Sequence, residues 1–150
     1  MRVVEGNLFD SDAELLIHQV NCMGIMGSGV AKELKMRYPE VEEEYRKLCK
    51  SRNSSELLGE VQFCKTSSGQ WIANLFGQEH INPTWYIGGK VTDYEALDKA
   101  FAKIAEFMSE NNLSSAAVPY KMSCVRGGGK WDEVVSIIEQ HTNKVTAYRL

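Results

Sequence analysis

The 150-residue chain has the composition of an ordinary globular protein, with 43% hydrophobic and 25% charged residues and only three prolines, which argues against long disordered segments. A chain of this length fits a single domain, residues 1–150, that buries roughly two thirds of its unfolded surface. The formal net charge of −3 leaves no broad cationic surface, so no nucleic-acid partner is expected.

No segment has the pattern of a membrane span or of a leader. No apolar stretch approaches the roughly 20 residues that cross a bilayer, and residues 1–10 lack the charged and apolar blocks of a signal peptide. We therefore expect a cytoplasmic protein without a membrane partner. No group of histidines, cysteines and carboxylates has metal-ligand spacing, so neither a metal nor another cofactor is expected.

The first half of the chain predicts alternating strands and helices. The residue before a proline avoids the helical region, so a helix that starts at Gly29 should stop at Tyr38-Pro39, and Pro39 can open the next helix. Apolar runs predict strands at residues 2–5, 14–20, 61–63 and 71–76, the last two joined as a hairpin around residues 67–69.

The second half continues this alternation after an irregular segment. Residues 77–92 show little periodicity, which is typical of a functional or mobile loop that could cover a ligand. Asp93 should cap a helix with Tyr94, Leu97, Phe101, Ile104 and Met108 in the core. A strand at 114–118, a helix over 131–138 and a strand at 144–148 follow. This order predicts an α/β/α sandwich that binds its ligand at the carboxyl ends of the strands.

Two glycine-bearing turns, residues 21–29 and 123–129, each follow a predicted buried strand and precede a predicted helix. Such turns present backbone N–H groups at the positive end of a helix dipole, which favours phosphate binding. Two of them in one small domain predict a ligand with more than one phosphate. Cys22 and Cys124 lie in these turns. Each has two interpretations: a catalytic thiol, or a small side chain that packs near the ligand.

The run from His18 to Ala31, followed by Arg37-Tyr38-Pro39, resembles the first ligand loop of macro domains. It is most similar to the branch that includes the yeast ADP-ribose 1''-phosphate phosphatase, the terminal ADP-ribose protein glycohydrolase and many phage proteins. Residues 6–8, 119–131 and 145–150 resemble the adenine-side turn, the second phosphate loop and the closing strand of that family, in the same order. The resemblance implies a three-layer α/β/α macro domain with a mixed, mostly parallel central sheet of about six strands.

The resemblance also implies a set of ligand-binding residues. Asn7 would hydrogen-bond the adenine amino group, unless it only caps a turn, and Asn21 would point at the distal ribose. The two glycine turns would hold the diphosphate, unless Gly27 and Gly29 only permit tight packing. The complete expected set is Asn7, Leu8, Met26, Gly27, Ser28, Gly29, Val30, Ser123, Cys124, Val125, Arg126, Gly127, Gly128, Tyr148 and Leu150.

His18 and Asn21 are the expected catalytic residues. The yeast phosphatase also has a histidine at the position of His18. His18 would donate a proton to the leaving ribose oxygen or attack phosphorus. The alternative is a core histidine whose ring is satisfied by backbone groups. The glycohydrolase branch uses a lysine and an aspartate where this chain has Gly77 and Gly127. Its lysine route is therefore not expected here.

The resemblance implies an ADP-ribose-binding domain that hydrolyses ADP-ribose 1''-phosphate to ADP-ribose and phosphate. Two alternatives stay open: a non-catalytic reader of free or protein-linked ADP-ribose, and a de-ADP-ribosylating hydrolase with another catalytic group. The expected partners are a small-molecule ligand, ADP-ribose or a derivative, and, under either alternative, ADP-ribosylated protein. In the segment 77–92, Trp85 and Tyr86 are weaker candidates for contact with the ligand, and His80 is weaker still.

Overall fold

Six strands form one mixed sheet in a computed structural model that describes residues 1–27, 29–81, 91–125 and 127–150. The strand order is β1-β6-β5-β2-β4-β3, and every neighbouring pair is parallel except the β3–β4 hairpin. The bounds are β1 Arg2–Glu5, β2 Leu15–Asn21, β3 Val61–Lys65, β4 Trp71–Gln78, β5 Ala116–Pro119 and β6 Val145–Arg149. The predicted mixed, mostly parallel sheet is confirmed.

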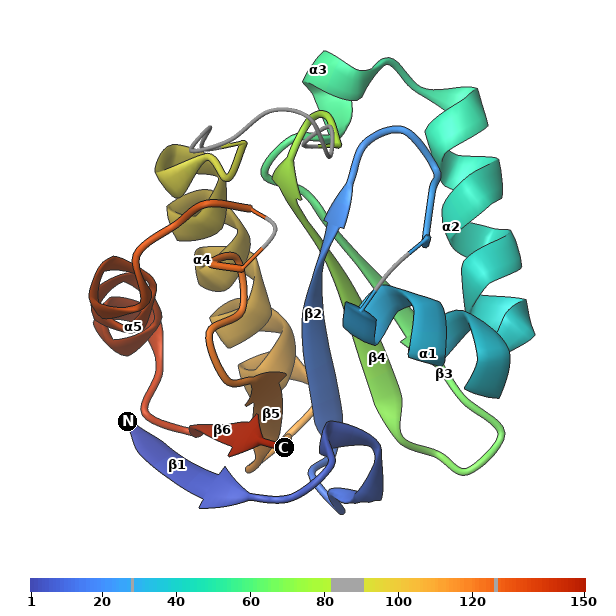
Figure 1. Cartoon of the computed structure of the whole chain (residues 1–150). Helices are drawn as coiled ribbons and strands as arrows, with labels where there is room; N and C mark the ends of the chain where they lie inside the picture. The colour runs from blue at the N-terminus through green and yellow to red at the C-terminus, as the bar shows by residue number, and fades with distance from the viewer. Residues whose placement is uncertain (28, 82–90, 126) are drawn as a thin grey trace.

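Helices cover both faces of this sheet and make three layers (Figure 1). The helices α4 and α5 lie on one face, and α1 and α2 lie on the other. The helical elements are η1 Leu8–Asp10, a 3-10 turn, and α1 Gly29–Arg37, α2 Pro39–Ser51, α3 Ser54–Leu57, α4 Tyr94–Glu110 and α5 Trp131–His141. The short η1 and α3 were not predicted, because a single helical turn shows no apolar periodicity.

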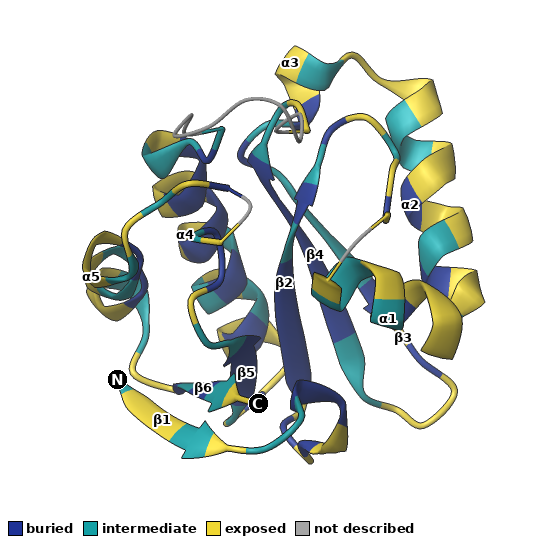
Figure 2. Cartoon of the chain, in the orientation of Figure 1, coloured by how far each residue is buried: buried dark blue, intermediate teal, exposed yellow. Residues whose placement is uncertain are grey.

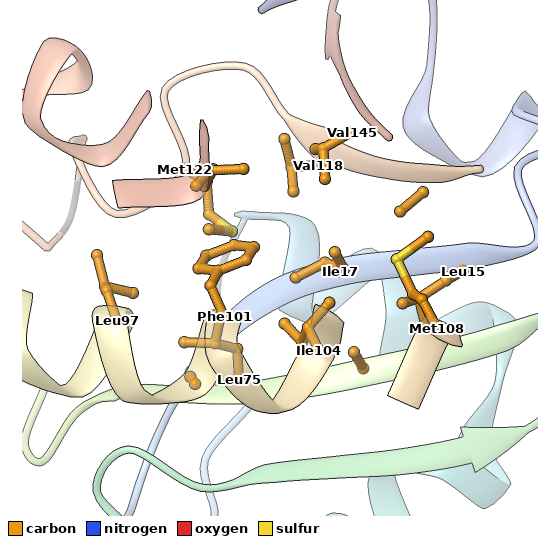
Figure 3. Packing of buried hydrophobic residues seen from close by; sticks show 14 of the residues in the cluster. Leu15, Ile17, Leu75, Leu97, Phe101, Ile104, Met108, Val118, Met122 and Val145 are labelled. Carbon is orange, nitrogen blue, oxygen red and sulfur yellow. The ribbon is translucent and has the colours of Figure 1, made fainter. Parts of the chain in front are cut away.

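The helix α4 forms the larger hydrophobic core with the sheet. Its N-cap is Asp93, whose side chain accepts a hydrogen bond of 3.0 Å from the Ala96 N–H, and its predicted core stripe is buried at Leu97, Phe101, Ile104 and Met108. Phe101 packs among side chains of β2, β4 and the segment after β5 (Figure 3). Tyr94 differs from the prediction because it is only partly buried, and its hydroxyl accepts the Lys130 N–H.

The helix α2 covers the other face and starts at the proline that the sequence indicates. Val41 and Tyr45 are buried against the sheet. The outward face of α2 is exposed (Figure 2), and the pair Glu43–Lys47 lies on it. The charged residues on this face of α2 therefore form a solvated surface.

The parallel strands β2, β4 and β5 end at the same edge of the sheet. The segments 21–29 and 119–130 leave the sheet there and lead to α1 and α5. Among the described helices, none has the length and apolar character needed to cross a membrane.

Candidate functional site

A crevice of about 530 Å³ lies at the carboxyl ends of β2, β4 and β5. Its volume falls in the range of small-molecule sites. Its walls come from described residues of loop 1, defined as residues 21–29, and of loop 2, defined as residues 119–129. The lining residues are His18, Gln19, Val20, Asn21, Ile25, Gly27, Gly29, Val30, Ala31, Gln78, Ile81, Pro119, Tyr120, Lys121, Met122, Ser123, Val125 and Gly127.

The crevice brings together many of the expected site residues. Those present are His18, Asn21, Gly27, Gly29, Val30, Ser123, Val125 and Gly127. Ser28, Trp85, Tyr86 and Arg126 lie outside the described residues. The expected residues that do not line the crevice are Asn7, Leu8, Met26, Cys124, Gly128, Tyr148 and Leu150.

Each residue that does not line the crevice has another environment. Asn7 caps η1, where its Oδ1 accepts the Phe9 N–H at 2.9 Å, as the turn-capping alternative predicts. Leu8 and Met26 are buried in the core beneath α1 and α2. The Cys124 thiol donates to the Met122 carbonyl, and the Gly128 N–H donates to the Cys124 carbonyl. Tyr148 is half-buried on β6, and Leu150 is 90% exposed.

Loop 1 is shaped by the side chain of Asn21. Its Oδ1 accepts hydrogen bonds from the Tyr45 hydroxyl at 2.9 Å and from the Met23 N–H at 3.0 Å, and its Nδ2 donates to the Ile25 carbonyl at 2.9 Å. These bonds hold the amide within the loop. Asn21 also borders the crevice, and its bonds fix the course of loop 1.

The helix α1 begins at Gly29 on the wall of the crevice. The first N–H groups of a helix have no partner within it. Gly29, Val30 and Ala31 all line the crevice, so the positive end of the α1 dipole faces this space. This end of the helix is suited to bind an anion.

Ser123 fixes the course of loop 2. Its backbone is in a left-handed conformation with φ 73°, which is uncommon for a residue other than glycine. The Ser123 hydroxyl donates to Gln19 Oε1, and the Ser123 carbonyl accepts from the Thr92 hydroxyl at 3.0 Å. Gln19 Nε2 in turn donates to Gln78 Oε1 at 2.7 Å and to Thr92 Oγ1 at 2.9 Å. Gln19 thus ties β2 to loop 2 and to the end of β4.

His18 lies 2% exposed on β2, beneath the crevice. Its Nε2 is 2.6 Å from Asn74 Oδ1, and its Nδ1 is buried without a hydrogen-bond partner among the described residues. Burial lowers the pKa of His18 to about 4, and the bond to Asn74 opposes that shift only in part. The imidazole is therefore neutral at pH 7, which argues against a proton-donating imidazolium.

The comparisons with known proteins agree with this architecture. The family model described as "Macro domain" matches residues 17–138. The chain belongs to the macro domain family. Among solved structures, the macrodomain of Mycobacterium tuberculosis DarG superposes with a TM-score of 0.80 at 28% identity, over 98% of this chain and 95% of that one. A Bacteroides thetaiotaomicron protein of unknown function superposes with a TM-score of 0.85 at 27% identity, over 99% of this chain and 97% of that one.

Curated relatives of this macro domain include two kinds of hydrolase. The DNA ADP-ribosyl glycohydrolase of Mycobacterium tuberculosis is 34% identical over 137 residues, which is 86% of this chain and 35% of that protein. The ADP-ribose 1''-phosphate phosphatase of Saccharomyces cerevisiae is 43% identical over 58 residues, 37% of this chain and 32% of that one. The chain thus spans about a third of the length of these relatives.

At two glycines of the macro domain, an added side chain would displace its neighbours. A Cβ on Gly77 would lie 2.3 Å from Gln19 Oε1, and one on Gly127 would lie 2.0 Å from Thr92 Oγ1. The space beside Gly77 and Gly127, the positions that the resemblance matches to lysine and aspartate, is occupied by Gln19 and Thr92. Sequence reasoning missed both of these residues, although Gln19 is a polar residue in a mostly buried strand and thereby gave a signal.

The cysteines of the macro domain are unsuited to nucleophilic catalysis. Burial raises the pKa of Cys22 to about 12 and also raises the pKa of Cys124. Both thiols stay protonated at neutral pH, so the structure favours the packing interpretation. His80 is exposed and pairs with Glu79 instead of lining the crevice. Within the described part of the chain, no cluster of three or more potential metal ligands occurs.

Proposed function

We propose that this macro domain binds ADP-ribose in the crevice and hydrolyses the bond between the distal ribose and its substituent. The observation that carries the proposal is the convergence of two walls on one space: the first turn of α1 and loop 2. Backbone N–H groups at a helix start are suited to bind phosphate oxygens. Loop 2 forms the opposite wall of the crevice, so a diphosphate bound at the start of α1 would lie between the two walls.

ADP-ribose 1''-phosphate is the first candidate substrate. The match to the yeast phosphatase, 43% identity over 58 residues, supports this choice. His18 would act as a proton acceptor for the attacking water instead of a proton donor, because its neutral ring leaves Nδ1 without a hydrogen-bond partner among the described residues. Loop amides would stabilise the phosphoryl oxygens as charge develops.

ADP-ribosylated DNA is a second candidate substrate. The relatives named DNA ADP-ribosyl glycohydrolase match 86% of this chain, which is more than the phosphatase matches. Hydrolysis at the distal ribose would need the same crevice and the same proton acceptor. The net charge of −3 provides no broad basic surface for a nucleic-acid backbone, so recognition would rest on the ADP-ribose group itself.

The test combines binding with hydrolysis. Calorimetry with ADP-ribose measures binding, and three assays measure release from ADP-ribose 1''-phosphate, from an ADP-ribosylated DNA oligonucleotide and from an ADP-ribosylated protein. We expect binding with one site per chain and turnover of one of the first two substrates. The substitution His18→Gln should lower turnover more than affinity, and the matched control His141→Gln, on α5 beside Asp98, should change neither.

The results separate the proposal from its rivals. Binding without release from any substrate would assign a non-catalytic reader. Release only from modified protein would assign the de-ADP-ribosylating alternative. Absence of binding would contradict the whole proposal.

A further inference from the structure

Three polar side chains form a row across the sheet on the α1 and α2 side. The strand register places His18 opposite Asn74 and Asn74 opposite Gln62. Asn74 Oδ1 lies 2.6 Å from His18 Nε2, and Asn74 Nδ2 donates to Gln62 Oε1 at 3.0 Å. Gln62 Nε2 donates to the Glu44 carbonyl of α2 at 3.1 Å.

The last contact fixes the direction of every bond in the row. A backbone carbonyl only accepts, so the Gln62 amide must present its nitrogen to Glu44 and its oxygen to Asn74. Asn74 must then donate with Nδ2, which leaves Oδ1 toward the histidine. The reverse orientation of Gln62 would place two acceptors, its Oε1 and the Glu44 oxygen, against each other.

The geometry points to an amide relay from the Glu44 carbonyl through Gln62 and Asn74 that fixes His18 as the Nε2–H tautomer and keeps Nδ1 as a bare hydrogen-bond acceptor. Asn74 and Gln62 are then positioning residues, because they act on the ligand only through the imidazole. The ring nitrogen that carries the proton is set by the partner of the other nitrogen. Neither strand position shows this role in the sequence, since β3 and β4 contribute nothing to the glycine turns.

The inference names the kind of atom that Nδ1 accepts, and in this respect it rests on the proposed function. A bare lone pair bonds a hydroxyl or a water and repels an unprotonated phosphate oxygen. We therefore assign to Nδ1 a water or a ribose hydroxyl, and the phosphate oxygens to the helix start of α1 and to loop 2. A buried acceptor without a partner destabilises the protein, and a bound hydroxyl or water would supply the missing hydrogen bond to Nδ1.

Nuclear magnetic resonance of protein labelled with ¹⁵N-histidine tests the relay. Long-range ¹H–¹⁵N correlations distinguish a protonated ring nitrogen from a bare one, and the chain has only three histidines, so the spectrum of His18→Gln identifies the signals of His18. At pH 7 we expect Nε2 protonated and Nδ1 bare. The Nδ1–H tautomer, or an imidazolium, in the wild-type protein would overturn the inference.

Two variants of Gln62 probe the direction of the relay. Gln62→Leu frees the Asn74 amide to turn its nitrogen toward the imidazole, so an Nδ1–H population should appear. Gln62→Glu still accepts from Asn74 and should keep the wild-type tautomer. The matched control is Gln70→Leu, which removes an amide that donates to the Ser11 and Ala13 carbonyls. An unchanged tautomer in folded Gln62→Leu would contradict the relay.

Kinetics distinguish a failure of the relay from a failure of the proposed function. On the substrate that is turned over, Gln62→Leu should lower kcat on the order of 10²-fold, the lower range for loss of general-base catalysis, with a much smaller change in KM. If the wild-type chain hydrolyses nothing but shows the expected tautomer, the proposed hydrolysis fails and the relay stands. If turnover occurs with the other tautomer, the relay fails alone.

Discussion

At the scale of single residues, His18 links the stability of the domain to pH. Burial lowers its pKa from about 6.5 to about 4, so between these values the unfolded chain binds a proton that the folded chain does not. Stability rises with pH wherever the unfolded state binds more protons. This contribution is therefore complete above pH 6.5 and is lost as the pH falls toward 4.

We predict that His18 lowers the free energy of unfolding by ~2 kcal/mol at pH 5 relative to pH 8. Urea denaturation of the wild-type protein and of His18→Gln at both pH values measures the difference, because glutamine does not titrate. The wild-type protein should lose more stability on acidification than the variant does. Parallel losses in the two proteins would show that His18 is not buried in its neutral form.

Asn21 shows what a residue pattern tells and what it leaves out. The sequence correctly placed it at the head of a loop on the crevice, because a polar residue that ends a buried strand lies at the edge of the sheet. Its hydrogen bonds to Tyr45 and to the backbone of loop 1 depend on the packing of α2. Since that packing is a tertiary contact, no local pattern could reveal it.

At the scale of elements, loop 2 depends on the segment just before α4. The Thr92 hydroxyl donates to the Ser123 carbonyl, and the Gly127 carbonyl accepts the N–H groups of Val91 and Thr92 at 3.0 and 2.9 Å. These bonds join two segments more than 30 residues apart. These bonds therefore fix the position of loop 2 in the wall of the crevice.

We predict that Thr92→Val weakens ADP-ribose binding about tenfold, equivalent to about 1.4 kcal/mol, because loop 2 loses the hydroxyl that holds its Ser123 carbonyl and must be ordered on binding. Calorimetry provides the measurement. The matched control Thr66→Val removes a buried hydroxyl that bonds the Gln70 carbonyl at 2.7 Å in the β3–β4 turn, and it should leave affinity unchanged. Equal affinities for Thr92→Val and the wild-type protein would argue against the junction.

Gly127 and Gly77 should differ in their tolerance of alanine. A Cβ on Gly127 would lie 2.6 Å from the Ser123 carbonyl oxygen, which is backbone, whereas one on Gly77 would meet the side-chain ends of Gln19 and Leu97. Overpacking typically costs 1–3 kcal/mol. We predict a loss near the upper end of this range, ~3 kcal/mol, for Gly127→Ala and a smaller loss for Gly77→Ala in urea denaturation. The reverse order would contradict this placement of loop 2.

At the scale of the whole molecule, the sequence supported the fold better than it supported the site. Apolar periodicity, Pro39 and the Asp93 cap are local signals, and they gave the order of the main strands and helices. The neighbours of β2 are β4 and β5, which lie far away in the sequence. The contacts of Gln19 with Ser123 and of His18 with Asn74 arise only from this strand order and register, so they could not be predicted locally.

The central claim is that loop 1, α1 and loop 2 hold ADP-ribose together. A ¹H–¹⁵N correlation titration with ADP-ribose tests it most directly, because it reports on each backbone amide separately. We predict saturable shifts that are largest for the amides of Gly27, Gly29, Val30, Val125 and Gly127, which border the crevice. Shifts confined to other faces of the molecule, or no shifts at millimolar ligand, would contradict the account.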